Sequence, residues 1–221
     1  MNLHAPSPAA LRTLRQTLLD RHRTLQQTAD WIAKPAPNGI QAAILHPADG
    51  TIPIVQARST IACPARQLFD YLVTDIDRTC REWNDVMIYS ATIRDLGEGF
   101  ALSRIISEGH VVADREDVFL RCTLAQEDGT YIELSQGVGT AVEPVYTGIS
   151  RYTQRSLMHF ASKEITPLSP HACHYQTIWH YDPAGWLGRL VPRKLLGSMI
   201  LKNLIHEHQK LAGILGAVPT S

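Results

Sequence analysis

Apolar positions recur at helical spacing in two segments at opposite ends of the chain. The first predicts a helix over 8–33, opened by Ser7-Pro8 and ended by the proline- and glycine-containing stretch 34–39. The second predicts a long final helix within 186–215, which begins or bends at Pro192. The apolar stripe of the first helix consists of Leu11, Leu14, Leu18, Leu25 and Ile32.

Between these helices, mostly alternating apolar and polar positions predict strands. Two strands at 40–46 and 51–61 flank the turn at Asp49-Gly50, and short helices follow at 64–73 and 76–83. Six more strands are expected at 86–96, 100–108, 114–125, 130–138, 155–165 and 172–181. The long irregular stretch 139–154 is typical of a lid or binding loop.

This order of elements predicts an α+β fold. Sequential hairpins favour one antiparallel sheet, and a strongly curved sheet that grips the long terminal helix accommodates every predicted element. Such a sheet leaves space between its concave face and the helix, so the pattern favours an internal cavity.

The distribution of charge adds to this picture, because the total charge argues against one class of function and indicates none. The 221 residues carry 21 basic and 21 acidic groups, and a net charge of zero argues against a nucleic-acid-binding protein. The first 34 residues, however, have a net charge of +3 and residues 186–221 have +4, so the middle carries −7. The basic ends are either solvated helix faces or surfaces that meet an anionic membrane.

Local motifs give no evidence of catalytic or metal chemistry. The four cysteines include no Cys-x-x-Cys pair, and His206-x-His208 would point to different sides of a helix. No Gly-x-Ser-x-Gly elbow or phosphate-binding glycine loop occurs. We therefore expect no catalytic residues, no metal and no cofactor. The chain also lacks a secretory signal or a spanning apolar run, which favours a soluble, cytoplasmic protein with reduced cysteines.

The most informative segment is the predicted strand 115–122. Arg121 and Phe119 share one face of this strand, within a run that is otherwise strongly apolar. Either that face is exposed to solvent, or Arg121 is a charged group inside an apolar cavity that orients a ligand head group.

Four segments in this order resemble the START (steroidogenic acute regulatory protein-related lipid transfer) domain family, within the helix-grip or Bet v 1-like superfamily. They are Glu82-Trp83-Asn84-Asp85-Val86, Arg115-x-x-Val118-x-x-Arg121-Cys122, Pro144-x-x-x-Gly148-x-x-Arg151 and Tyr181-Asp182-Pro183-Ala184-Gly185-Trp186. With its flanking elements, the resemblance covers about 40–215. It divides the chain into an N-terminal helix extension (1–36) and a START-like lipid-binding domain (37–221).

The resemblance implies a helix-grip fold with a deep cavity for one lipid or other hydrophobic molecule, closed by the C-terminal helix and nearby loops. It places Arg121 inside the cavity and gives Arg115 a structural role. We take Glu108 as the expected acidic partner of Arg121. Glu116 and Asp117 replace the family's Asp and Phe after Arg115, which leaves the pairing of Arg115 open.

Strand parity and helical spacing suggest further ligand contacts. On the last strand the bulkier set, which includes Tyr175, Trp179 and Tyr181, is expected to face inward, with Tyr181 a core residue. On the final helix, Leu195, Leu196, Met199 and Ile200 are expected to face the sheet, and Trp186 and Leu187 to form an exposed apolar tip. The predicted ligand-binding residues are Arg121, Phe119, Tyr175, Trp179, Leu196, Met199 and Ile200.

Three functions fit these expectations. The first is a carrier that binds a lipid and transfers it between membranes. The second is a helix-grip enzyme, such as a cyclase, aromatase or hydrolase, acting on a hydrophobic substrate. The third is an interaction module, which predicts an exposed stripe at Leu11, Leu14 and Leu18.

Overall fold

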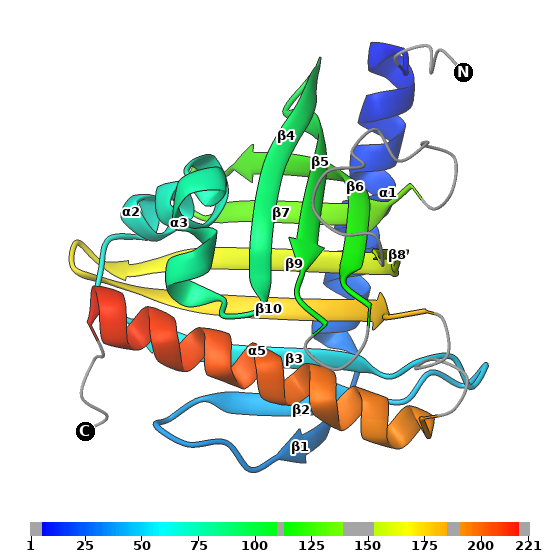
Figure 1. The fold of residues 1–221 in the computed structure, drawn as a ribbon. Helices are drawn as coiled ribbons and strands as arrows, with labels where there is room; N and C mark the ends of the chain where they lie inside the picture. Colours follow the sequence, from blue (N-terminus) through cyan, green and yellow to red (C-terminus); the bar gives the residue numbers. More distant parts are fainter. Residues whose placement is uncertain (1–5, 110–112, 139–152, 185–190, 217–221) are drawn as a thin grey trace.

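In the computed structural model, one curved sheet of ten strands carries helices on both faces (Figure 1). The structure describes residues 6–109, 113–138, 153–184 and 191–216. The order across the sheet is β1-β2-β3-β10-β9-β7-β6-β5-β4, and the short β8 lies parallel beside β6. The strands are β1 (Ile32–Lys34), β2 (Gln41–Leu45), β3 (Ile54–Ile61), β4 (Met87–Gly97), β5 (Phe100–Ser107), β6 (Arg115–Ala125), β7 (Tyr131–Gly137), β8 (Gln154–Arg155), β9 (Leu157–Ser169) and β10 (Ala172–Asp182).

Every pairing along the main path of the sheet is antiparallel. Sequential hairpins build most of it, and the pairing of β3 with β10 joins the N-terminal hairpin to the rest. The predicted α+β helix-grip architecture is therefore confirmed, and the expected strands lie within a few residues of the observed ones.

The C-terminal helix α5 (Arg193–Leu215) lies across one face of the sheet, over β2 and β3 (Figure 1). We call this face the inner face. Leu196, Ile200 and Leu204 of α5 form one buried cluster with Val55 and Ala57 of β3. Gly197 permits this close approach, because a Cβ there would lie 2.9 Å from two carbons of the Pro53 side chain.

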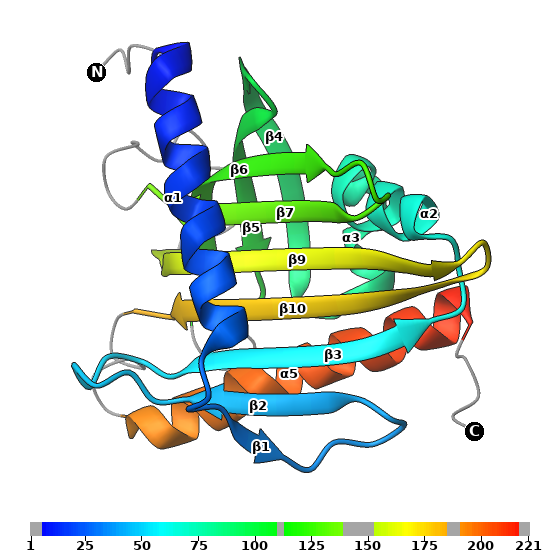
Figure 2. The same ribbon diagram turned by 180° about the vertical axis from the view of Figure 1, so that it is seen from behind.

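The N-terminal helix α1 (Pro8–Gln27) crosses the opposite, outer face (Figure 2). Leu11 and Leu18 are each 1% exposed and pack with Phe160 and Ile178 of the sheet. The exposed stripe expected of an interaction module is therefore wrong for these two leucines.

The helix also ends earlier than the predicted residue 33. The backbone becomes extended at Thr28, and the Trp31 indole N–H donates to the Leu25 carbonyl at 2.8 Å. Ile32, which fits the helical spacing, instead pairs with Ile44 in the sheet. Within the described residues, no helix has both the length and the apolar character needed to cross a membrane.

The other helices in the described part of the chain form one connected segment at the far end of the inner face (Figure 1). It comprises α2 (Ala65–Phe69), the π-helical turn η1 (Asp70–Thr74) and α3 (Ile76–Trp83). Trp83 is 1% exposed in a cluster that also contains Tyr175 of β10 and Leu211 of α5. This segment therefore closes the core at the C-terminal end of α5.

Candidate functional site

The inner face of the sheet, opposite α5, is the candidate site. Alternation along β10 directs Tyr175 and Trp179 toward α5, where Tyr175 bonds to Glu207 and Trp179 packs against the cluster around Leu196. The expected inward orientation of this residue set is thus confirmed, whereas ligand contact by its members stays a prediction.

Four buried polar residues meet under the C-terminal half of α5, and we call them the acid–lysine cluster. Lys163 Nζ lies 3.2 Å from both carboxylate oxygens of Glu133. The Tyr175 hydroxyl donates to Glu207 Oε1 at 2.8 Å. The cluster thus comes from β7, β9, β10 and α5, and it places ionisable groups in the middle of an apolar core.

Glu207 is the member of this cluster with an unsatisfied atom. The residue is 2% exposed, and its Oε2 has no hydrogen-bond partner. Burial raises the pKa of its carboxyl to about 7, while Lys163, Tyr175 and Asn84 oppose that rise. A buried carboxyl oxygen without a partner is energetically costly, so it marks a place where a ligand group can bind.

Replacing Glu207 by glutamine is expected to remove part of the pH dependence of stability. The folded-state pKa lies above the ordinary 4.5, so this group contributes stability below pH 4.5 that is lost as the pH rises through 7. A pKa raised from 4.5 to about 7 corresponds to a loss of roughly 3 kcal/mol of stability, at about 1.4 kcal/mol per pH unit. Glutamine does not ionise, so the variant avoids this loss. Urea denaturation of both proteins at pH 5 and pH 8 measures the difference, and parallel pH profiles would contradict the assignment.

His208 lies beside this cluster and is fully buried. Its Nδ1 lies 2.7 Å from Ser59 Oγ, its Nε2 lies 3.1 Å from Thr177 Oγ1, and its ring stacks on Tyr175 at 4.5 Å. Burial lowers the pKa of the imidazole to about 3. His208 is therefore neutral near pH 7 and serves to anchor α5 to β3 and β10.

A second buried polar group lies where β6, β8 and β10 meet, and we call it the β6–β10 cluster. The Ser156 hydroxyl donates to Asp117 Oδ1 at 2.6 Å, and Tyr181 also bonds to Asp117. Burial raises the pKa of Asp117 to about 6. Arg115, two residues earlier on the same face of β6, is 5% exposed, and its Nε and Nη2 have no partner.

Arg121 lies on the inner face but is already engaged. Its guanidinium donates to the Val73 carbonyl at 3.1 Å and to the Thr92 hydroxyl at 3.2 Å, so it fastens η1 to β4. Glu108 is not placed to pair with it. The register sets Ser107 opposite Arg115, six residues along β6 from Arg121, which is about 20 Å. The expectation of a Glu108–Arg121 pair is therefore wrong.

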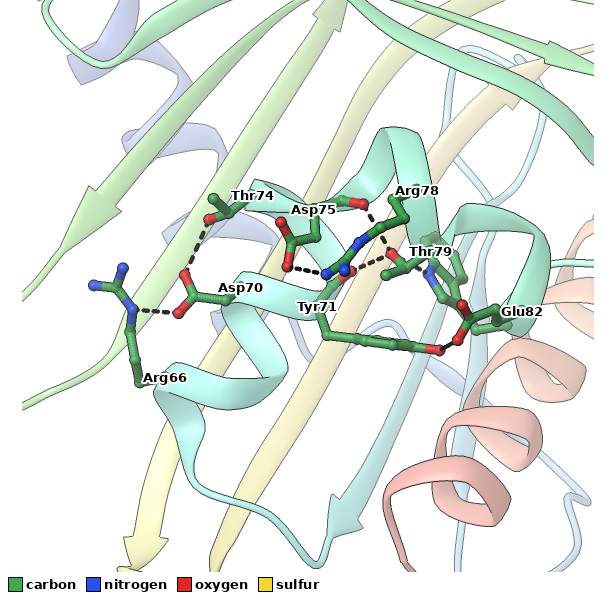
Figure 3. A network of polar contacts seen from close by, with 9 residues as sticks. Arg66, Asp70, Tyr71, Thr74, Asp75, Arg78, Thr79 and Glu82 are labelled. Carbon is green, nitrogen blue, oxygen red and sulfur yellow. Dashed lines mark hydrogen bonds and ion pairs between the residues drawn. The ribbon is translucent and has the colours of Figure 1, made fainter.

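The segment that Arg121 holds is braced by its own polar contacts (Figure 3). The Tyr71 hydroxyl donates to Glu82 at 2.6 Å, and the Thr79 hydroxyl donates to the Tyr71 carbonyl at 2.5 Å, which joins η1 to α3. Asp70 accepts from Arg66 at 2.7 Å and from Thr74 at 3.0 Å. These side chains bond to one another, so they support the site rather than present free groups to it.

The predicted helix contacts divide into two pairs. Leu196 and Ile200 face the sheet as expected, whereas Leu195 and Met199 are 53% and 48% exposed. With about 100° per residue, the buried stripe through Leu196, Ile200 and Leu204 turns these two residues to the flank of the helix. Their expected orientation toward the sheet is therefore wrong.

Phe119, another of the predicted ligand contacts, is buried on β6 with 3% of its surface exposed.

Sequence reasoning missed the two clusters. A signal for Glu207 was available, because Glu207 and His208 continue the spacing of Leu204 and Leu211 on the buried face of α5. Asp117 stood out only as an acid at the position of the family's Phe, and no comparable signal exists for Glu133 or Lys163, whose positions alternate as ordinary strand residues. The expectations for 139–152, Trp186 and Leu187 fall outside the described residues. Within the described part, no group of three or more His, Cys, Asp or Glu is placed to hold a metal ion.

Comparisons with known proteins agree with this architecture. Solved structures with the same fold include the human StAR-related lipid transfer protein 5, with a TM-score of 0.76 and 15% identity, covering 92% of this chain and 95% of that one. Human STARD10 gives a TM-score of 0.70 at 18% identity, covering 94% of this chain and 80% of that one.

A bacterial structure is also similar, that of a STAR-related lipid transfer protein fragment from Xanthomonas axonopodis. Its TM-score is 0.66 at 14% identity, with coverage of 84% of this chain and 98% of that one. A search of curated protein sequences gives no significant match. The START domain model matches residues 22–212, which is most of the sequence. The chain therefore belongs to the START domain family, whose members bind lipids.

Proposed function

We propose that this chain binds one lipid or other hydrophobic molecule between the inner face of its sheet and α5, and transfers it between membranes. Family membership supports lipid binding in general. The observation that carries the proposal for this chain is the composition of the inner face. Apolar residues of α5 pack on β2, β3 and β10 of this face, and each of the two buried polar clusters leaves at least one polar atom without a partner.

This arrangement suits an amphiphile. Each CH₂ group removed from water contributes about 0.8 kcal/mol, so a long apolar chain binds without any chemical step. The unpartnered atoms of Glu207 and Arg115 then supply the few polar contacts that orient the ligand.

Native mass spectrometry of the protein purified from its own host tests this proposal. The expected result is a one-to-one complex that releases a hydrophobic small molecule on activation in the gas phase. A protein that carries no such molecule, and takes up none when mixed with a lipid extract of that host, would overturn it.

The exposed side of α5 is the surface we assign to membrane contact. Leu195 and Met199 are exposed beside the exposed basic residues Arg193, Lys194 and Lys202. Apolar side chains flanked by cations on one helix favour an anionic bilayer surface.

Flotation with vesicles tests this surface. More protein should float with vesicles containing phosphatidylserine than with phosphatidylcholine alone, by several-fold at low salt, because each cation near the surface contributes about 1 kcal/mol. The double variant Lys194→Glu/Lys202→Glu should lose that difference, while Lys34→Glu on β1 should keep it. Flotation that is insensitive to anionic lipid would contradict the membrane role.

An enzyme acting on a hydrophobic substrate is the second candidate. The observation that favours it is the buried Glu207 carboxyl, whose pKa of about 7 suits a general acid or base. Incubation of the released ligand with the purified protein separates the two functions. A carrier returns the compound unchanged, whereas an enzyme converts it and loses that conversion in the Glu207→Gln variant.

A further inference from the structure

We propose that the ligand carries a polar group at each end: a carboxylate that pairs with Arg115 and a hydroxyl that bonds to Glu207. This inference rests on the proposed lipid binding and names the chemical class of the ligand. The class is a long-chain hydroxy acid, with an apolar chain between its two polar ends.

The Glu207 end provides for a hydroxyl. Its Oε1 already accepts from Tyr175, and its Oε2 lies buried without a partner. A ligand hydroxyl can donate to that oxygen when Glu207 is ionised, or accept from it when Glu207 is protonated. A ligand carboxylate is disfavoured here, because Glu133 lies in the same cluster and already takes the ammonium group of Lys163.

The Arg115 end provides for an acid. Its guanidinium is buried, and among its nitrogens Nη1 donates to the Ala113 carbonyl while Nε and Nη2 have no partner. Two adjacent N–H donors on one guanidinium match the two oxygens of a carboxylate. The neighbouring Asp117 does not take this position, because it is bonded to Ser156 and Tyr181 instead.

The two ends lie far enough apart for a long chain. Tyr175 marks the Glu207 end of β10 and Tyr181 marks the Arg115 end, six residues or about 20 Å along the strand. Between them the inner face presents Trp179, which packs against the apolar cluster of Leu196 and Ile200. An extended chain of about sixteen carbons spans such a distance. Each CH₂ group that it buries contributes roughly 0.8 kcal/mol to binding.

Direct titration with four probes tests the inference: 16-hydroxyhexadecanoic acid, hexadecanoic acid, 1-hexadecanol and hexadecane. The delipidated protein is titrated with each, and the quenching of tryptophan fluorescence reports occupancy. The hydroxy acid is expected to bind at least about ten-fold more tightly than either compound with one polar end, since each buried end gains a hydrogen bond to a charged group.

Two variants assign the ends. Arg115→Met should remove the preference for acid over alcohol and keep the preference for a terminal hydroxyl, and Glu207→Met should do the reverse. Arg121→Leu is the matched control. The wild-type Arg121 guanidinium already has two partners, so its removal should leave both preferences unchanged. Loss of the acid preference in Arg121→Leu but not in Arg115→Met would overturn the assignment.

The wild-type titrations remain decisive if a variant does not fold. Equal affinity for all four probes would overturn the two-ended ligand while leaving lipid binding intact. Failure to bind any of them, together with an empty protein in native mass spectrometry, would instead overturn the proposed function.

Discussion

Replacing Lys163 by methionine is expected to lower the free energy of unfolding by about 3–5 kcal/mol, which is the cost of breaking a buried ion pair from one side. Lys163 is 9% exposed, and its ammonium group lies 3.2 Å from both oxygens of Glu133. Without it, Glu133 and the nearby Glu207 face each other as buried acids in a core with no compensating charge. Urea denaturation at pH 8, above the Glu207 pKa of about 7, measures the loss.

The double variant Lys163→Met/Glu133→Leu is expected to recover most of that loss, because removing both partners leaves no buried charge between β7 and β9. Lys210→Met is the matched control. Lys210 pairs with Asp85 at the surface, where the median ion pair contributes about 0–1 kcal/mol. A Lys163→Met protein as stable as the Lys210→Met control would show that the acid–lysine cluster is not energetically coupled.

Replacing Leu204 by alanine is expected to cost about 2–5 kcal/mol, the range for deleting a buried leucine side chain. The Leu204 side chain of α5 is fully buried against β3. Gly197 packs closely on Pro53, and this contact limits how far the helix can move into the vacated space. Because α5 forms one wall of the candidate site, the variant should also bind apolar ligands more weakly. Thermal and urea denaturation measure the first effect, and ligand titration the second.

Leu195→Ala on the same helix is the control and is expected to change stability by about 0.5 kcal/mol or less, because Leu195 is 53% exposed. Equal losses in Leu195→Ala and Leu204→Ala would mean that α5 is seated differently against the sheet. The comparison therefore tests the orientation that spacing alone misassigned.

The fold was predictable because its periodic signals are strong. Alternation in the strands and three-and-four spacing in the final helix predict the elements, and the resemblance of four motifs to the START family implies their helix-grip arrangement. The first helix was overextended because Ile32 satisfies helical spacing equally well, and only its pairing with Ile44 distinguishes the two structures. Leu195 and Met199 were misplaced because consecutive apolar residues do not show where the buried stripe of a helix ends and its exposed flank begins.

The candidate site was predictable only in part, because its polar contacts join residues far apart in sequence. Glu133, Lys163 and Glu207 come from three elements, and no local pattern links them. Arg121 was recognisable as unusual within an apolar strand, but its partner Val73 lies 48 residues away on a helical turn. Parity identified Tyr175 as inward-facing, yet its partner on α5 required the tertiary structure.

The most direct test of the central claim is to locate a bound ligand by photo-crosslinking. The delipidated protein is loaded with a fatty acid that carries a diazirine in mid-chain, irradiated, digested and analysed by mass spectrometry. Crosslinks are expected on peptides of β10 and α5, near Trp179, Leu196 and Ile200, where the inner face meets the helix. Crosslinks confined to α1 and the outer face, with none on β10 or α5, would contradict ligand binding between the sheet and the C-terminal helix.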